Sequence, residues 1–144
     1  MGRILAVCIS ERKGTAKHPV DALSLRVGHG IDGDAHAGSW HRQVSLLATE
    51  SIEPMRVRCP DLPIGAFAEN ILTEGIELKS LSVGTVLAAG ETLLAVTQIG
   101  KECHADCAIR KAVGDCVMPR EGIFAVVLRG GTIRPNDKIE IITL

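Results

Sequence analysis

The sequence is poor in aromatic residues and carries almost no net charge. Its 144 residues include one tryptophan, two phenylalanines and no tyrosine, so the stacking platforms that grip single-stranded nucleic acid are missing. The 16 basic and 17 acidic side chains give a formal net charge of −1, which provides no strong field for nucleic acid or an anionic membrane. We therefore expect neither nucleic acid nor a membrane as a partner.

Long hydrophobic runs are also missing. Residues 1–10 (MGRILAVCIS) are apolar but too short to span a bilayer, and residues 11–13 are charged with no secretory cleavage pattern. We expect a cytoplasmic protein. Its five cysteines are an odd number, and in a reducing compartment they favour free thiols, metal ligands or nucleophiles over a disulfide framework.

Short β-compatible runs outnumber helical ones. Residues 28–38 hold four glycines and two aspartates, a composition that predicts a loop without regular structure. Helices are expected at 50–58, with Thr49 or Ser51 as the N-cap, and at 104–113. Strands are expected at 3–10, 43–48, 69–73, 76–78, 85–89, 92–97, 123–128 and 138–142.

This order of elements has no long repeat and no low-complexity linker. Turns stand directly before β runs, as they do at the rims of barrels. We therefore expect one mainly β domain over residues 1–144, with a barrel-like sheet and one or two peripheral helices.

Residues 101–107 (KECHADC) are the first stretch that could carry chemistry. Cys103 and Cys107 stand at the start of a predicted helix beside Lys101 and His104, and both a helix N-terminus and cationic neighbours lower the pKa of a thiol. These cysteines are therefore candidate nucleophiles or metal ligands. The alternative is that they are small buried apolar residues.

A zinc site competes with this interpretation, because Cys103, His104, Cys107 and Cys116 are all zinc-ligand types. Their spacing differs from that of a zinc finger, which has two separated pairs of ligands. A loop after Gly114 could bring Cys116 back toward Cys107. We assign the two other cysteines, Cys8 and Cys59, to structure.

Two further stretches could form a binding site. In residues 33–42 (GDAHAGSWHR), a glycine-rich loop offers backbone N–H groups to an anion, and Arg42 and His36 add charge-assisted donors. A metal held by Asp34, His36 and His41 is a second possibility, and local turn capping a third. In residues 67–73 (FAENILT), Asn70 and Thr73 either contact a ligand or bond to the chain itself.

Taken together, the sequence resembles the MOSC family, named for the C-terminal domain of molybdenum cofactor sulfurases, in its small stand-alone form. The resemblance covers nearly the whole chain. It rests on residues 30–38 (GIDGDAHAG), 41–48 (HRQVSLLA), 65–71 (GAFAENI), 97–104 (TQIGKECH) with Cys107, and 116–124 (CVMPREGIF).

The resemblance implies a β-barrel-like fold and a functional cysteine. Members either carry sulfur as a persulfide, received from a pyridoxal-phosphate desulfurase, or bind molybdopterin with the cysteine on molybdenum. This implies a sulfurtransferase-like protein or a molybdenum-cofactor-dependent reductase. Alignment with relatives places the functional cysteine, which is also the metal ligand, at Cys107, with Cys103 as a resolving thiol.

We expect the polar groups around the pterin to be Arg42, Asn70, Thr73, Lys101, Arg120 and His36. The partner is then the pterin cofactor or the sulfur donor protein. A zinc-stabilised or plain β module that binds a partner without catalysis is the competing class, and a thiol redox sensor using Cys103 and Cys107 is the third.

Overall fold

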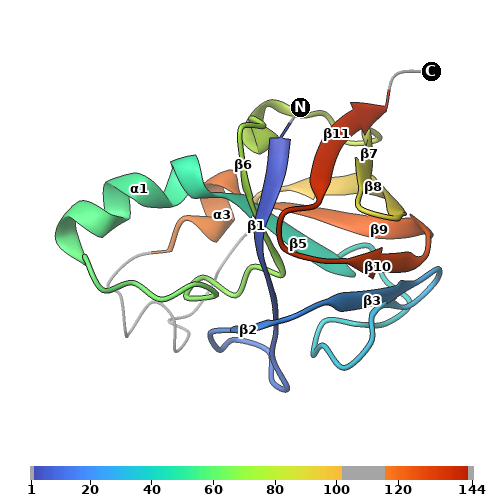
Figure 1. Cartoon of the computed structure of the whole chain (residues 1–144), viewed down its shortest axis with the longest axis horizontal. Helices are drawn as coiled ribbons and strands as arrows, with labels where there is room; N and C mark the ends of the chain where they lie inside the picture. Colours follow the sequence, from blue (N-terminus) through green and yellow to red (C-terminus); the bar gives the residue numbers. More distant parts are fainter. Residues whose placement is uncertain (1, 102–115, 143–144) are drawn as a thin grey trace.

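The computed structural model describes residues 2–101 and 116–142. These residues form a mainly β fold with two α-helices and one 3-10 helix (Figure 1). In chain order the elements are β1 (Gly2–Ile9), β2 (His18–Val20), β3 (Leu23–Arg26), β4 (Gly30–Ile31), β5 (Val44–Ala48), α1 (Thr49–Arg58), β6 (Ile71–Glu74), η1 (Leu78–Ser80), β7 (Val86–Ala89), β8 (Thr92–Ile99), α3 (Met118–Glu121), β9 (Ile123–Arg129), β10 (Gly131–Ile133) and β11 (Lys138–Ile142).

Seven strands close into a barrel in the order β1-β11-β7-β8-β9-β5-β6, with β6 returning to β1. Strand β1 makes closure possible because its two ends pair differently. Its start pairs with β11 (Gly2 with Ile139), and its end pairs with β2, which lies outside the ring. A register shift between Ile4 and Ala6 accompanies this change, as expected where a strand bends to close a sheet.

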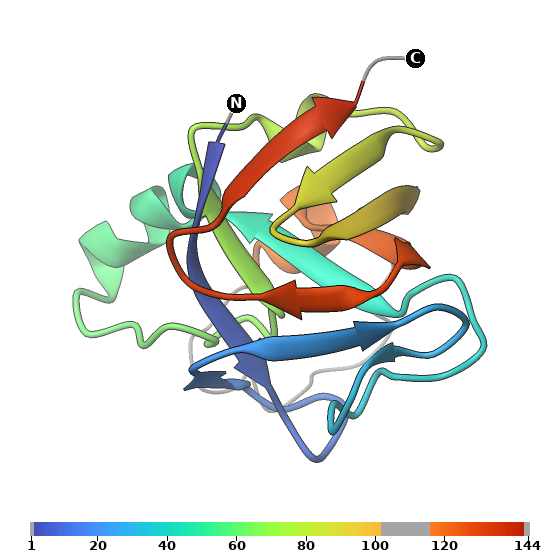
Figure 2. The same cartoon turned by 45° about the vertical axis from the view of Figure 1, so that its right-hand side comes forward.

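A second sheet of three strands, in the order β10-β3-β4, lies beside the barrel (Figure 2). Helices α1 and α3 lie together on another side of the barrel (Figure 1). No helix among the described residues is long and apolar enough to cross a membrane.

Side chains alternate across the barrel wall and form two separate apolar clusters. In β5, Leu46 and Ala48 face the interior cluster, whereas Leu47 faces an outer cluster that includes Met55 of α1 and Met118 of α3. This alternation is the period of two that a strand imposes on its side chains. The helices therefore cover the outer face of the wall. The interior cluster combines inward-facing residues of the barrel with residues of the second sheet, such as Leu23, Leu25 and Ile31.

The mainly β architecture predicted from sequence is confirmed, and so are the hairpin of β7 and β8, the strands β5, β9 and β11, and the end of α1 at Cys59. Other predictions were wrong. Residues 76–78 form no strand and lead into η1, the loop over 28–38 contains the short strand β4, and β10 was not predicted. The N-cap of α1 is Ala48, with no side-chain hydrogen bond. The predicted helix over 104–113 lies outside the described residues.

Thr73 of β6 is an exception to the apolar barrel interior. It pairs in register with Ala48 of β5, so the two side chains share a face of the sheet. Thr73 is fully buried, and its hydroxyl has no hydrogen-bond partner within residues 2–101 and 116–142. A buried hydroxyl without a partner costs free energy, because it has lost its water and gained nothing in return.

We therefore expect Thr73→Val to raise the free energy of unfolding by about 1 kcal/mol, since the methyl group has no hydrogen bond to lose. The matched control is Thr92→Val. Thr92 is equally buried, but its Oγ1 donates to the carbonyl oxygen of Ala89 at 2.8 Å, so this variant should lose about 1 kcal/mol. Urea unfolding of both variants checks the prediction, and equal losses in the two would contradict it.

Candidate functional site

A small pocket lies against the outer face of the barrel wall, where β5 and β9 run side by side. Its cavity is about 70 Å³. Loops from both halves of the chain contribute to its lining, which comprises Gly14, His36, Arg42, Ser45, Phe67, Ala68, Lys101, Cys116, Met118 and Phe124. Residues of the glycine-rich loop thus lie close to Lys101 and Cys116.

The wall formed by Phe67 and Ala68 is held in place by a buried carboxylate. Glu69 accepts hydrogen bonds from the backbone N–H groups of Gly65 at 2.9 Å and Phe67 at 3.1 Å. Burial raises the pKa of Glu69, and these backbone bonds oppose that rise. Ala68 has a φ of 64°, a left-handed conformation that is costly for a residue with a side chain.

Gly65 is required where this wall meets the chain before β2. Its φ is +89°, and a Cβ atom there would lie 2.0 Å from the carbonyl oxygen of Lys17. The Lys17 N–H donates to the carbonyl oxygen of Gly65 at 2.8 Å. A residue with a side chain would therefore separate the two segments.

Asn70 lies behind the pocket and joins three strands. Its Oδ1 accepts from the N–H of Ser45 at 3.0 Å, and its Nδ2 donates to the carbonyl oxygen of Cys8 at 3.0 Å. The side chain is completely buried. Of the two roles that the sequence allowed for Asn70, these contacts match bonding to the chain itself.

The glycine-rich loop is organised by a buried ion pair. The side chains of Lys17 and Asp34 are both 0% exposed, with Nζ and Oδ1 2.8 Å apart. Lys17 Nζ also lies 3.1 Å from Ser10 Oγ and 3.0 Å from His36 Nδ1. An ammonium group has three protons, and each of them has an acceptor here.

This arrangement fixes the tautomer of His36. An ammonium group only donates, so Nδ1 must accept, and the single proton of the neutral ring is then on Nε2. Burial and the charge of Lys17 lower the pKa of His36 to about 4, against the opposing effect of Asp34. At neutral pH His36 therefore contributes an uncharged ring with a donor at Nε2.

Arg42 contributes a permanent positive charge to the pocket. Its guanidinium lies 4.7 Å from the ring centre of Trp40 and 5.6 Å from that of Phe124, in positions suited to cation–π attraction. The Nε atom is buried and has no hydrogen-bond partner among the residues that the structure describes. The aromatic rings thus hold Arg42 in place while a strong donor stays unsatisfied.

Lys101 and Cys116 line the same pocket. They are the described residues on either side of 102–115. The N–H of Lys101 donates to the carbonyl oxygen of Pro119 at 3.0 Å. This bond connects the segment that follows β8 to α3. Cys107 and Cys103, the cysteines predicted to be functional, lie outside the described residues.

The other predicted site residues are distributed unevenly. The structure brings Arg42, His36 and Lys101 together at the pocket. Thr73 lies inside the barrel, and Arg120, in α3, is not part of the pocket lining. Within residues 2–101 and 116–142, no three His, Cys, Asp or Glu side chains are placed to share a metal ion, so the Asp34, His36 and His41 metal site is not formed.

The sequence did not identify Lys17 as a site residue, nor Phe67, Ala68 and Phe124 as pocket walls. Lys17 stands in a polar stretch (residues 10–18, SERKGTAKH) where a lysine is ordinarily solvated, and no local pattern distinguishes it from Lys13. Cys8, assigned to structure, is fully buried, and burial raises its pKa to about 12. It therefore stays a thiol at neutral pH.

The structure resembles three solved proteins over almost its whole length. YuaD from Bacillus subtilis matches with a TM-score of 0.79 and 19% identity, covering 98% of this chain and 96% of that one. YiiM from Geobacillus stearothermophilus has a TM-score of 0.75 and 19% identity, covering 99% and 76%. YiiM from Escherichia coli has a TM-score of 0.69 and 19% identity, covering 99% and 70%.

At these identities the solved structures establish the fold alone. No curated protein sequence matches the chain. The model of the MOSC domain matches residues 33–140, which include most of the pocket lining. The chain therefore belongs to the MOSC domain family, whose functions are associated with the molybdenum cofactor.

Proposed function

We propose that the chain is a sulfur carrier of molybdenum cofactor metabolism, and that the pocket at Arg42 receives the carried sulfur as a persulfide anion. The observation that supports this most directly is the buried Nε of Arg42, which has no hydrogen-bond partner among residues 2–101 and 116–142. Lys101 and the Nε2 proton of His36 add two further donors to the same lining. Such a set of donors favours an anion in a site partly removed from water.

The cysteine that carries the sulfur is Cys107 in this proposal, with Cys103 as the resolving thiol. The thiolate attacks the outer sulfur of a persulfide on a pyridoxal-phosphate desulfurase. One sulfur–sulfur bond forms on the carrier, one breaks on the donor, and the donor cysteine leaves as a thiolate. The exchange needs no external oxidant, because the transferred sulfur keeps its oxidation state.

The size of the pocket favours a carried sulfur over a bound pterin. Donors of this kind suit the phosphate of molybdopterin, but the cavity is about 70 Å³, and pockets for molecules of that size range from about 300 to 1,000 Å³. The described residues therefore do not enclose a pterin, and we assign no step to one. Binding of molybdopterin, with Cys107 on molybdenum, is the alternative that the experiment below separates.

The test is intact-protein mass spectrometry after incubation with a cysteine desulfurase and cysteine, comparing the unmodified chain with Cys107→Ala, Cys103→Ala and Cys116→Ala. We expect an added mass of about 32 Da, one sulfur atom, that disappears in Cys107→Ala. A molybdenum-bearing pterin on protein from a cofactor-producing host would support the alternative. Stoichiometric zinc without either would indicate a binding module, and both results would contradict the carrier role.

Arg42→Met tests the pocket. The variant keeps an apolar side chain against Trp40 and Phe124 but removes the charge, so we expect persulfide occupancy to fall about tenfold, the loss of one charge-assisted hydrogen bond. The control is Arg26→Met, since Arg26 pairs with Asp32 on the surface at 2.7 Å. Equal occupancy in the two variants would rule out a role for Arg42 in holding the sulfur.

The lowered pKa of His36 predicts a pH-dependent stability. Between about pH 6.5, where an unfolded histidine titrates, and about 4, the folded value, the unfolded state binds more protons than the folded state. The contribution to stability is therefore complete above pH 6.5 and is lost as the pH falls toward 4, by about 3 kcal/mol in total.

Urea unfolding of the unmodified chain and of His36→Gln over this pH range measures the contribution as a difference. The imidazole nitrogens, followed by NMR, should titrate near pH 4 with the proton on Nε2. Lys17→Met should raise the pKa of His36, because a nearby positive charge is removed while Asp34 remains. An unperturbed titration near pH 6.5 in the unmodified chain would contradict the assignment.

A further inference from the structure

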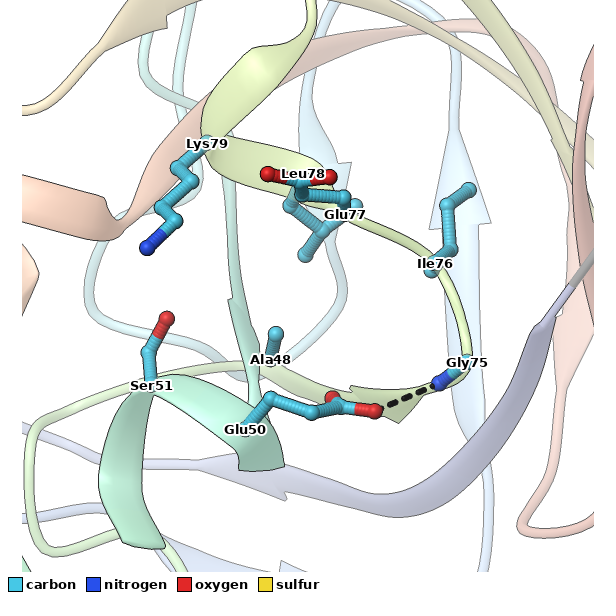
Figure 3. Close-up of a pocket in the computed structure, with 8 residues that line it drawn as sticks. All are labelled: Ala48, Glu50, Ser51, Gly75, Ile76, Glu77, Leu78 and Lys79. Carbon is cyan, nitrogen blue, oxygen red and sulfur yellow. Dashed lines mark hydrogen bonds between the residues drawn. The ribbon is translucent and has the colours of Figure 1, made fainter. Parts of the chain in front are cut away.

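A second cavity, larger than the first, lies at the end of the barrel where β5 leads into α1 (Figure 3). Its volume is about 390 Å³, within the range of small-molecule sites. Ala48, Glu50 and Ser51 line one side, and the segment from Gly75 to Lys79 lines the other. Nothing in the proposed sulfur chemistry uses this cavity.

The floor of this cavity is apolar and belongs to the barrel core. Ala48, Ile76 and Leu78 are 5%, 7% and 1% exposed and are members of the interior cluster. The small exposed parts of these side chains line the cavity, where a short aliphatic chain would contact them.

The mouth of the cavity carries an excess of negative charge. Figure 3 shows Glu50 and Glu77 on opposite sides of the cavity, with the carboxylate of Glu50 turned toward Gly75. Their neighbours are neutral donors: the N–H of Gly75 bonds to Glu50 at 2.9 Å, and the hydroxyl of Ser80 bonds to Glu77 at 2.8 Å.

Lys79 is the cation in the lining, and it is already paired. Its Nζ lies 3.1 Å from Oε1 of Glu121, the same oxygen that accepts from Ser51 at 3.0 Å. The charge of Lys79 is therefore balanced by Glu121, and the charges of Glu50 and Glu77 remain available to a ligand.

From this combination we infer that the cavity binds a small organic cation, with an ammonium or guanidinium group between Glu50 and Glu77 and a short aliphatic chain on the apolar floor. An organic cation satisfies both parts of the site at once, because its nitrogen donates to carboxylates and its carbon chain covers Ala48, Ile76 and Leu78. An anionic ligand would meet two carboxylates of its own sign.

The test uses n-pentylammonium as the probe, with 1-pentanol as a neutral molecule of similar length. Titrations on the full chain are followed by NMR through the amide of Gly75 and the methyl groups of Ile76 and Leu78. We expect saturable shifts with the ammonium at millimolar concentration, while Ala68 in the other pocket stays unshifted. Pentanol should bind about tenfold more weakly, because it lacks the charge-assisted bonds.

Glu50→Gln and Glu77→Gln should each weaken the binding about fivefold, and both keep an oxygen acceptor for their present donors. The matched control is Glu53→Gln, since Glu53 is also on α1 but pairs with Arg56 at 2.6 Å away from the cavity. Equal binding of pentanol and the ammonium, or equal affinities of all three variants and the unmodified chain, would overturn the inference. Absence of saturable shifts would overturn it as well.

Discussion

The buried ammonium group of Lys17 is the constraint on which the geometry of the pocket depends. Removing an ion from water is costly, and the cost is recovered only when every proton finds a well-placed acceptor. The three acceptors here are Ser10 after β1 and Asp34 and His36 in the glycine-rich loop. The hydrogen bonds to this one ammonium group therefore bring separate segments of the chain together. The segment at Gly65 joins them, because Gly65 packs closely against the backbone of Lys17.

The candidate pocket at Arg42 lies outside the barrel. The interior is packed with aliphatic side chains, whereas the polar groups of the pocket stand on the outward face of β5 and on loops that cross it. Trp40 and Phe124, two of the three aromatic residues, lie beside Arg42. Phe124 also belongs to the outer apolar cluster, so it packs in the core and contacts the cation at once.

Much of the fold could be predicted from local patterns, because strands such as β5 and β9 are short, mostly apolar runs. Residues 76–78 were wrongly predicted as a strand because Ile76 and Leu78 are apolar at alternate positions, as in a half-buried strand. In the structure they pack into the interior cluster from a turn and from η1. At the pocket, Arg42, His36 and Lys101 could be predicted from residue type and neighbours. Lys17 could not, because its burial depends on Asp34, seventeen residues away, and on loop packing that no local pattern encodes.

A closed ring with an odd number of strands cannot alternate direction at every step, so at least one neighbouring pair must be parallel. In the described barrel of seven strands that pair is β5 and β6. Parallel neighbours need a crossover instead of a tight turn, and the crossover here is residues 49–70. It contributes Glu50 and Ser51 to one cavity and Phe67 and Ala68 to the other. The odd number of strands thus obliges the chain to leave the sheet at this point, and both candidate binding sites take part of their lining from the crossover.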